Sequence, residues 1–193
     1  MKKIVVVNGH PNKESFNHVL ANAYIEAATN KGAEVKYISI GELEFNPNLE
    51  FGYQKRMELE PDLVQALETI KWSDHQVWIH PIWWLGMPAI MKGFFDRAFL
   101  PNITFKTIKG ETTQGLLTSD TARIITTAGD LSYHEYEKTY HLSGLVQLQK
   151  GILEYCGISS IENNFIGPLN DLTENDRLQW IEKIKEIAIN DAI

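Results

Sequence analysis

Residues 76–97 read QVWIHPIWWLGMPAIMKGFFDR, a pattern typical of a buried strand, a short loop and a helix. The helix can begin after Pro88, because proline lacks the backbone N–H that the first helical residues leave unpaired. The loop at 82–87 contains Trp83 and Trp84 side by side. In open α/β sheets, ligands bind outside the carboxyl ends of the strands, so the two indoles predict a wall for a flat, conjugated ligand. Trp also packs in protein cores, which is the structural alternative for this pair.

The rest of the chain repeats this alternation of strand and helix. Continuous apolar runs predict strands buried on both faces, and the segments between them have apolar residues at helical spacing. Gly32 and Gly157 are placed to end helices, and Thr173 is placed to cap the last one. The predicted strands are 4–7, 35–40, 76–80, 123–127 and 160–166, and the predicted helices are about 17–31, 61–72, 89–99, 144–155 and from 173 onward, with an irregular section at 41–60.

Five strands alternating with five helices predict an α/β fold. We expect a single domain over residues 1–193, built as a three-layer α/β sandwich around a five-stranded parallel sheet of order 2-1-3-4-5. The loop at 8–13 has one glycine and cannot form the G-x-G-x-x-G turn, and the chain has no Walker lysine motif. A conventional NAD-dependent dehydrogenase and a P-loop NTPase are therefore disfavoured.

The composition limits the classes of partner. The chain has 18 basic and 25 acidic residues, a net charge of −7, and no lysine or arginine cluster that could follow a nucleic acid backbone. Its apolar stretches are too short to span a bilayer and its start has no signal-peptide pattern, so we expect a cytoplasmic protein without membrane insertion. The single cysteine, Cys156, lies in an apolar run and is expected to be buried, with no metal bound.

The loop after the first strand has several groups that bind anions. Ser15 and Asn17 lie where the next helix begins, so their side chains and the free backbone N–H groups can converge on a phosphate. His10 and Lys13 add donors, and Phe16 adds an apolar anchor. Taken singly, Ser15 is more often only a helix cap and His10 only a polar loop residue.

The fourth strand ends in Thr126, Thr127, Ala128 and Gly129, whose small side chains allow a ring to approach the backbone closely. Such loops also occur without a function, so this signal is weak by itself. Together, the three loops offer phosphate donors, indoles and hydroxyls at one edge of the sheet. They predict a flavin nucleotide with its phosphate on the first loop and its ring between the third and fourth.

These residues resemble the flavodoxin-like NAD(P)H:quinone oxidoreductases, including bacterial relatives called modulators of drug activity or general NAD(P)H oxidoreductases. The resemblance covers nearly the whole chain, and the third-strand segment is its most specific part. It rests on GHPNKESFNHVLA at 9–21, FNP at 45–47, HPIWWLGMPAIMKGFFDRAF at 80–99, ITTAG at 125–129 and KGILEYCGI at 150–158.

The resemblance implies a role for each of the three loops. The first loop would bind the flavin phosphates, the third would lie along the isoalloxazine, and the fourth would hold the far edge of the ring. In this sequence the matching positions are His10, Ser15, Phe16 and Asn17 for the first loop, Pro81, Ile82, Trp83, Trp84 and Leu85 for the third, and Thr126, Thr127, Ala128 and Gly129 for the fourth.

The activity implied by the resemblance is the transfer of a hydride from NAD(P)H, through the bound flavin, to a quinone or similar small acceptor in a two-electron, ping-pong cycle. The resemblance favours FAD over FMN. The family also places a tyrosine and a histidine after the fourth strand. Tyr133 and His141 are our candidates for stabilising negative charge near N1 and O2 of the reduced flavin, although the spacing does not align one to one.

An apolar stripe on and after the third crossover helix predicts a homodimer whose symmetric interface completes each pocket, and the resemblance indicates the same. Phe105 is expected to reach the substrate pocket from either subunit. The stripe comprises Met87, Phe94, Phe95, Phe99 and Phe105.

Two alternatives remain open from the sequence. One is a flavin-binding regulatory subunit of a potassium efflux system that has no significant turnover of its own. The other is a one-electron carrier of the flavodoxin type, whose phosphate loop is normally rich in hydroxyls, whereas Ser15 is the only one here. Oxidation of NAD(P)H with a quinone distinguishes an enzyme from the regulatory subunit.

Overall fold

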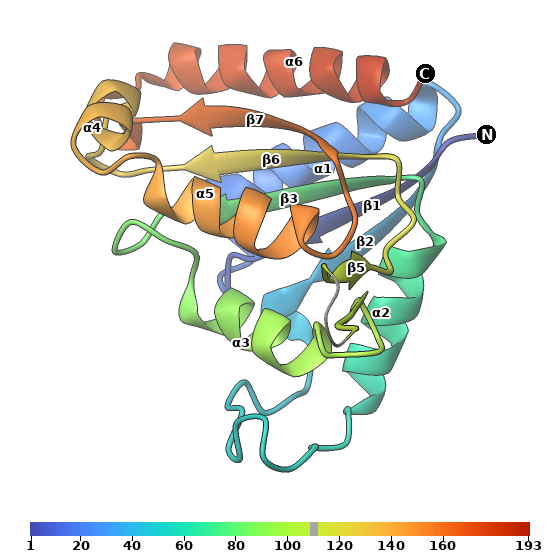
Figure 1. Ribbon diagram of the computed structural model, residues 1–193. Helices are drawn as coiled ribbons and strands as arrows, with labels where there is room; N and C mark the ends of the chain where they lie inside the picture. Colours follow the sequence, from blue (N-terminus) through green and yellow to red (C-terminus); the bar gives the residue numbers. More distant parts are fainter. Residues whose placement is uncertain (109–111) are drawn as a thin grey trace.

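A computed structural model describes residues 1–108 and 112–193 of the chain. It has a parallel five-stranded sheet with helices on both faces, which confirms the predicted three-layer architecture (Figure 1). The strand order is β2-β1-β3-β6-β7, which is the predicted order 2-1-3-4-5 once the separate β4–β5 pair is set aside. The strands of the sheet are β1 (Lys3–Asn8), β2 (Glu34–Ser39), β3 (His75–Pro81), β6 (Thr121–Thr127) and β7 (Ser160–Ile166).

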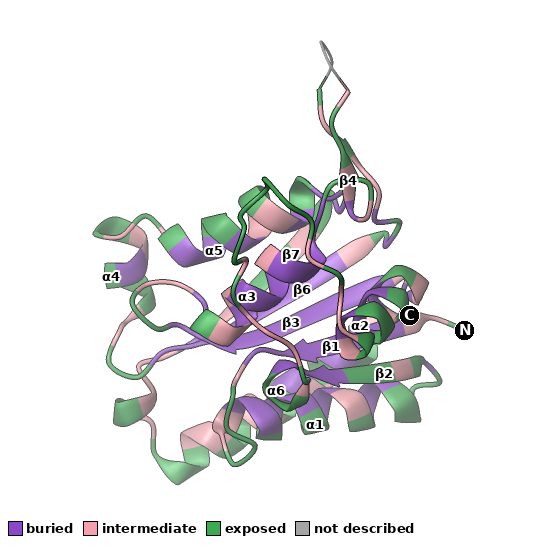
Figure 2. Ribbon diagram, turned by 90° about the horizontal axis from the view of Figure 1, so that it is seen from below, coloured by how far each residue is buried: buried purple, intermediate pink, exposed green. Residues whose placement is uncertain are grey.

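Helices cover both faces of the sheet, and each face has its own cluster of buried apolar residues. One face is covered by α1 (Phe16–Asn30) and α6 (Glu174–Asp191), which enclose Val77 and Ile79 of β3. The other face is covered by α2 (Pro61–Trp72), α3 (Ala89–Ala98) and α5 (Ser143–Leu148), which enclose Trp78. Figure 2 shows the central strands β1, β3 and β6 buried along most of their length, as expected of apolar runs in a parallel sheet.

Several short elements differ from the expectations. The predicted helix at 144–155 is α5 followed by a π-helical segment, η2 (Gln149–Glu154). The helix α4 (Tyr133–Lys138) and the hairpin of β4 (Phe105–Lys106) and β5 (Gln114–Gly115) were not predicted, because they are too short to show a hydrophobic period. Two 3-10 turns, η1 (Ile40–Glu42) and η3 (Leu169–Asp171), complete the fold.

The predicted apolar stripe proves to be part of this chain's own core. Met87, Phe94, Phe95 and Phe99 have exposed fractions of 8%, 0%, 3% and 7%, and they pack around Trp78 and its neighbours. Only Phe105, on β4, is half-buried. The stripe is therefore no argument for association, and the homodimer stays a prediction that needs other support.

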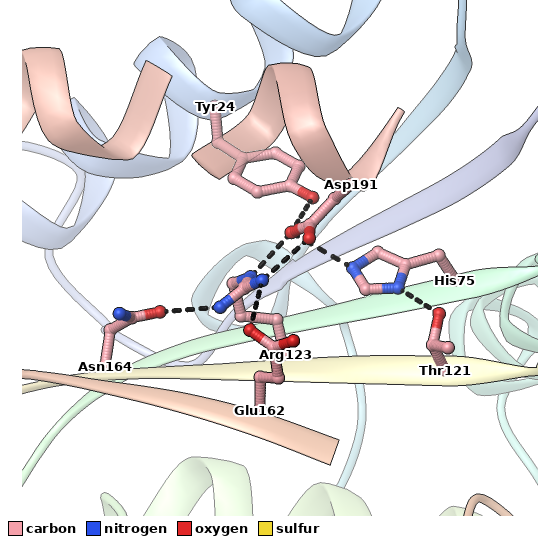
Figure 3. A network of polar contacts seen from close by, with 7 residues as sticks. All are labelled: Tyr24, His75, Thr121, Arg123, Glu162, Asn164 and Asp191. Atoms are coloured by element: carbon pink, nitrogen blue, oxygen red, sulfur yellow. Dashed lines mark hydrogen bonds and ion pairs between the residues drawn. The ribbon is translucent and has the colours of Figure 1, made fainter. Parts of the chain in front are cut away.

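A buried polar network joins the end of α6 to the amino-terminal edge of the sheet (Figure 3). Arg123 of β6 donates to both carboxylate oxygens of Asp191, at 2.6 and 2.7 Å. The Tyr24 hydroxyl donates to the same carboxylate at 2.8 Å, and His75 Nε2 lies 3.4 Å from it. Burial raises the pKa of Asp191, but the bonds from Arg123 and His75 outweigh it and hold the pKa well below its ordinary value.

Two features bear on the classes of site that the structure offers. No described helix is both long and apolar enough to cross a lipid bilayer. Over residues 1–108 and 112–193, no three histidine, cysteine or acidic side chains gather as they would around a metal ion.

Candidate functional site

The structure brings the three predicted loops together at the carboxyl edge of the sheet. The loop after β3 is joined to the end of β6 by a hydrogen bond from the Ile82 N–H to the Thr127 carbonyl, 2.7 Å. The loop after β1 meets the loop after β3 through the rings of His10 and Trp83, whose centroids are 5.4 Å apart and whose planes cross at 73°. These contacts bring the loops after β1, β3 and β6 together, and the surface that the three loops share is called the crevice from here on.

The first loop is held by its own side chains. Asn8 Oδ1 accepts from the His10 N–H at 2.9 Å, and His10 Nδ1 accepts from the Asn12 N–H at 3.0 Å. Burial lowers the pKa of His10, so the ring is neutral at pH 7. Since Nδ1 accepts a hydrogen bond, the proton of the neutral ring is on Nε2, which makes Nε2 a donor.

Ser15 and Asn17 have different local roles at the start of α1. Ser15 is the N-cap of the helix, and its Oγ accepts from the His18 N–H at 3.4 Å, as in the structural alternative. Asn17 is 2% exposed, and its Oδ1 accepts from the Thr127 hydroxyl at 2.9 Å. The Asn17 amide nitrogen is buried and has no partner among the described residues. A buried donor left unpaired costs about 1–3 kcal/mol, so this nitrogen is suited to a polar group that a ligand brings.

The aromatic loop is a tight turn with an unusual backbone. Trp83 and Gly86 exchange two hydrogen bonds of 2.9 and 3.0 Å across it. Between them, Trp84 and Leu85 have φ angles of 50° and 64°. Two consecutive positive φ angles are typical of a type I′ turn, which strongly favours Asn-Gly. Here two residues with large side chains adopt these positive φ angles, at a cost of the order of 1 kcal/mol each.

The neighbouring helices hold this strained turn in place. The Leu85 carbonyl accepts from the Tyr136 hydroxyl at 3.2 Å and from Ser143 Oγ at 3.4 Å. A Cβ at Gly144 would overlap the same carbonyl, so α5 can approach the turn only because that residue is glycine. The Trp84 side chain is 102% exposed and the Trp83 side chain 44%, which leaves both indoles open to a ligand.

We expect Trp84→Asn to raise the free energy of unfolding by about 1 kcal/mol, because asparagine tolerates positive φ and the exposed indole gives up no packing. Flavin binding and turnover should fall in the same variant. Urea unfolding, flavin titration and NAD(P)H oxidation measure the three quantities. If the variant is instead less stable and equally active, this would contradict the claim that the turn is strained and that the Trp84 indole contributes to ligand binding.

The residues at the end of β6 are mostly turned inward. The hydroxyl of Thr127 is used by Asn17, and that of Thr126 points toward the Asn164 carbonyl at 3.5 Å. Ala128 is 2% exposed, whereas Gly129 is exposed. A ligand at this loop would therefore meet Gly129 and the backbone rather than the predicted hydroxyls.

Tyr133 and His141 flank the short helix α4. Tyr133 is 43% exposed, and its ring lies 5.7 Å from that of Phe165. His141 is exposed and has a φ of 51°. Among the described residues, neither side chain forms a hydrogen bond or a ring contact with the loops after β1 and β3, so their proposed roles near a flavin stay predictions. Tyr136, which the sequence analysis missed, is the tyrosine that touches the aromatic turn, and its spacing on α4 gave no signal for this.

Two further residues at the site were not found from the sequence. The Arg177 guanidinium of α6 lies over the Phe16 ring, 5.4 Å from its centroid, and donates to the Leu169 carbonyl at 2.7 Å. This places a cation beside the first loop. His80, at the end of β3, is 1% exposed and donates from Nδ1 to the Pro81 carbonyl at 2.9 Å. Burial lowers the pKa of His80 to about 4, so it holds the start of the aromatic loop as a neutral ring.

Phe105 is not brought to the crevice within one chain. Its ring packs against Tyr155, 5.0 Å between centroids, and lines a groove of about 530 Å³ between α3 and the segment 147–156. This groove reaches Gln147 at one end. A Cβ placed on Gly86 would lie 3.8 Å from Gln147 Oε1, so the groove adjoins the aromatic turn.

Fold and site together define a flavodoxin-like α/β protein whose loops after β1, β3 and β6 meet at the carboxyl edge of its sheet. The chain belongs to the family described as having a flavodoxin-like fold, whose model matches residues 2–187. It is similar to an uncharacterized NAD(P)H oxidoreductase of Haemophilus influenzae, with 28% identity over 183 residues that cover 92% of this chain and 90% of that protein.

Solved structures resemble the whole chain. The NAD(P)H:quinone oxidoreductase of Methanothermobacter marburgensis has a TM-score of 0.85 and 19% identity, and the match covers 98% of each chain. An FMN-dependent NADH-azoreductase of Bacillus anthracis, in complex with FMN, has a TM-score of 0.77 and 17% identity, covering 100% of both chains. At these identities the two likenesses show a shared fold.

Proposed function

We propose that this protein is a flavin-dependent NAD(P)H oxidoreductase that passes electrons from NAD(P)H to a quinone or similar small acceptor. The observation that supports it best is the buried, unpaired amide nitrogen of Asn17 where the loops after β1 and β6 meet. A polar group of a bound nucleotide would give this donor its partner. The names of the relatives from Haemophilus influenzae and Methanothermobacter marburgensis are consistent with this activity.

The residues of the crevice fit the parts of a flavin nucleotide. The first loop, with His10, Ser15, Phe16 and Asn17, would hold the phosphate through backbone N–H groups and the Asn17 amide. Arg177 adds a cation beside Phe16, where a second phosphate or an adenine would lie, and this is our reason for favouring FAD over FMN. The azoreductase of Bacillus anthracis holds FMN in the same fold, so FMN is the alternative.

The flavin, when bound, would supply the reversible two-electron chemistry. The protein would orient the partners and exclude water. Trp83 and Trp84, with Pro81, Ile82 and Leu85, would form one wall for the ring and the nicotinamide. Gly129 and the backbone of Thr126, Thr127 and Ala128 would form the opposite edge. His10 Nε2 is a donor that can stabilise negative charge at the crevice, and Tyr133 and His141 are proposed for the same purpose at its far end.

We also propose that the protein acts as a homodimer in the cytoplasm. Large apolar side chains are exposed around the crevice, namely Trp84 at 102%, Trp83 at 44% and Tyr133 at 43%. Exposed apolar surface of this kind usually marks association. A partner subunit would bring a second Phe105 and complete the substrate pocket.

Steady-state kinetics with NADPH and a soluble quinone test the activity. We expect parallel lines in double-reciprocal plots, because the nicotinamide and the quinone would use the same pocket in turn. Intersecting lines would contradict the shared pocket. A protein that binds flavin but oxidises neither NADH nor NADPH would support the regulatory subunit instead.

A further inference from the structure

A second pocket, of about 260 Å³, lies between the segment 49–57 and the end of α3. In Figure 1 this segment is part of the irregular cyan stretch of chain below α3. The pocket is lined by three basic side chains, those of Lys55, Arg56 and Arg97, together with apolar and aromatic groups. No part of the proposed flavin site uses it.

The basic side chains give the pocket a positive charge in a chain whose net charge is −7. Arg97 is 1% exposed and is fixed by Glu60 at 2.8 Å and by the Glu58 carbonyl at 2.9 Å. Lys55 and Arg56 form no ion pair with any described carboxylate; the Lys55 ammonium lies 4.8 Å from the centroid of the Phe51 ring. Within residues 1–108 and 112–193, two of the three cations are therefore without a carboxylate partner and can bind an anion.

The rest of the lining suits a flat organic group. Met57, Leu100 and Pro101 provide apolar walls, and Tyr53 presents a ring that is 77% exposed. An arginine guanidinium can bind a phosphate through two parallel hydrogen bonds, and an exposed aromatic ring such as that of Tyr53 can stack on a base. The ligand that fits is a phosphate attached to a planar ring.

The pocket adjoins the groove that lies beside the aromatic turn. Tyr53 and Pro101 line both the pocket and the Phe105 groove, and the groove ends at Gln147 beside Gly86. Both hollows follow α3, whose ten residues span about 15 Å. An extended dinucleotide has a length of the same order, so it can lie along α3 with one end at the basic pocket.

We propose that this pocket binds the 2′-phosphate and adenine of NADPH and so makes the protein prefer NADPH to NADH. The proposal rests on the proposed oxidoreductase function, because it assigns one end of the reductant to this pocket. NADH lacks the 2′-phosphate and would leave Lys55 and Arg56 unused.

The first test is direct binding of 2′,5′-ADP, with 5′-ADP as the comparison, by calorimetry on the purified protein. We expect 2′,5′-ADP to bind at least tenfold more tightly, and Lys55→Gln/Arg56→Gln to abolish the difference. Equal affinity for the two nucleotides, or a difference that survives the double variant, would overturn the proposal. This readout needs no turnover, so it can succeed or fail independently of the oxidoreductase activity.

The second test is kinetic. In Lys55→Gln/Arg56→Gln, the KM for NADPH should rise about tenfold, while the KM for NADH and both kcat values stay unchanged. Lys71→Gln, which removes an exposed lysine from the end of α2, is the control and should change neither KM. Equal changes of the two KM values in the double variant would show that Lys55 and Arg56 do not bind the 2′-phosphate.

Discussion

Replacing Asp191 with alanine is expected to lower the free energy of unfolding by about 3–5 kcal/mol, because it leaves the buried guanidinium of Arg123 without its main counter-charge. The Asp191 carboxylate receives two hydrogen bonds from Arg123 and one from Tyr24, and its side chain is 10% exposed (Figure 3). The loss should also free the end of α6 from the sheet. Urea unfolding followed by circular dichroism measures the change.

Glu162→Ala is the matched control, since Glu162 pairs with the same guanidinium at 2.9 Å but is 74% exposed. An exposed ion pair contributes about 0–1 kcal/mol, so this variant should unfold nearly as the parent does. Equal decreases of the unfolding free energy in the two variants would contradict the claim that the burial of the Arg123–Asp191 pair determines its contribution to stability.

The same carboxylate gives the stability a dependence on pH. Its pKa is held below its ordinary value in the folded protein, so its contribution is complete above the unfolded pKa of about 3.9 and decreases as the pH falls below that. We expect the unfolding free energy of the parent to drop between about pH 4 and pH 2. In Asp191→Asn, the unfolding free energy should fall less over the same pH range. An identical pH profile in the two proteins would contradict the claim that the Asp191 carboxylate causes the decrease.

Asn17→Asp is expected to weaken flavin binding at least 100-fold, which is about 2.7 kcal/mol. Aspartate keeps the shape of the side chain and an acceptor for the Thr127 hydroxyl, but it replaces the unpaired amide nitrogen with negative charge beside the phosphate loop. Fluorescence titration of the protein freed of its flavin measures the affinity, and circular dichroism checks that the variant folds.

Thr127→Val separates the two roles of Asn17. It removes the 2.9 Å hydrogen bond to Asn17 Oδ1 but leaves the amide nitrogen available. We expect less than a tenfold loss of flavin affinity, about 1.4 kcal/mol. If Thr127→Val weakens binding as much as Asn17→Asp, the hydrogen bond between the two side chains is what the site requires, and the amide nitrogen is not a ligand donor.

The sheet and its order could be predicted because strands buried on both faces leave continuous apolar runs such as 4–7 and 76–80. The three loops of the crevice followed from the same strands, since carboxyl ends of parallel strands share one edge. The two-residue strands β4 and β5 could not be predicted, because two residues are too few to show a repeating hydrophobic pattern.

Other parts of the site depend on contacts between distant segments. Thr127 and Asn17 are 110 residues apart, and Arg177 reaches Phe16 from the last helix. The turn with positive φ at Trp84 and Leu85 contacts Tyr136 and α5 through the Leu85 carbonyl, and no local pattern encodes that contact. The apolar residues around Phe94 were read as an outer stripe because spacing alone does not show that α3 packs all of them against Trp78.

The most direct test of the account is to release the bound small molecule from the purified protein by heat and identify it by its absorption spectrum and chromatography. We predict a flavin at about one per chain, with FAD favoured over FMN. A colourless protein that takes up neither FAD nor FMN would contradict the central claim that the loops after β1, β3 and β6 bind a flavin.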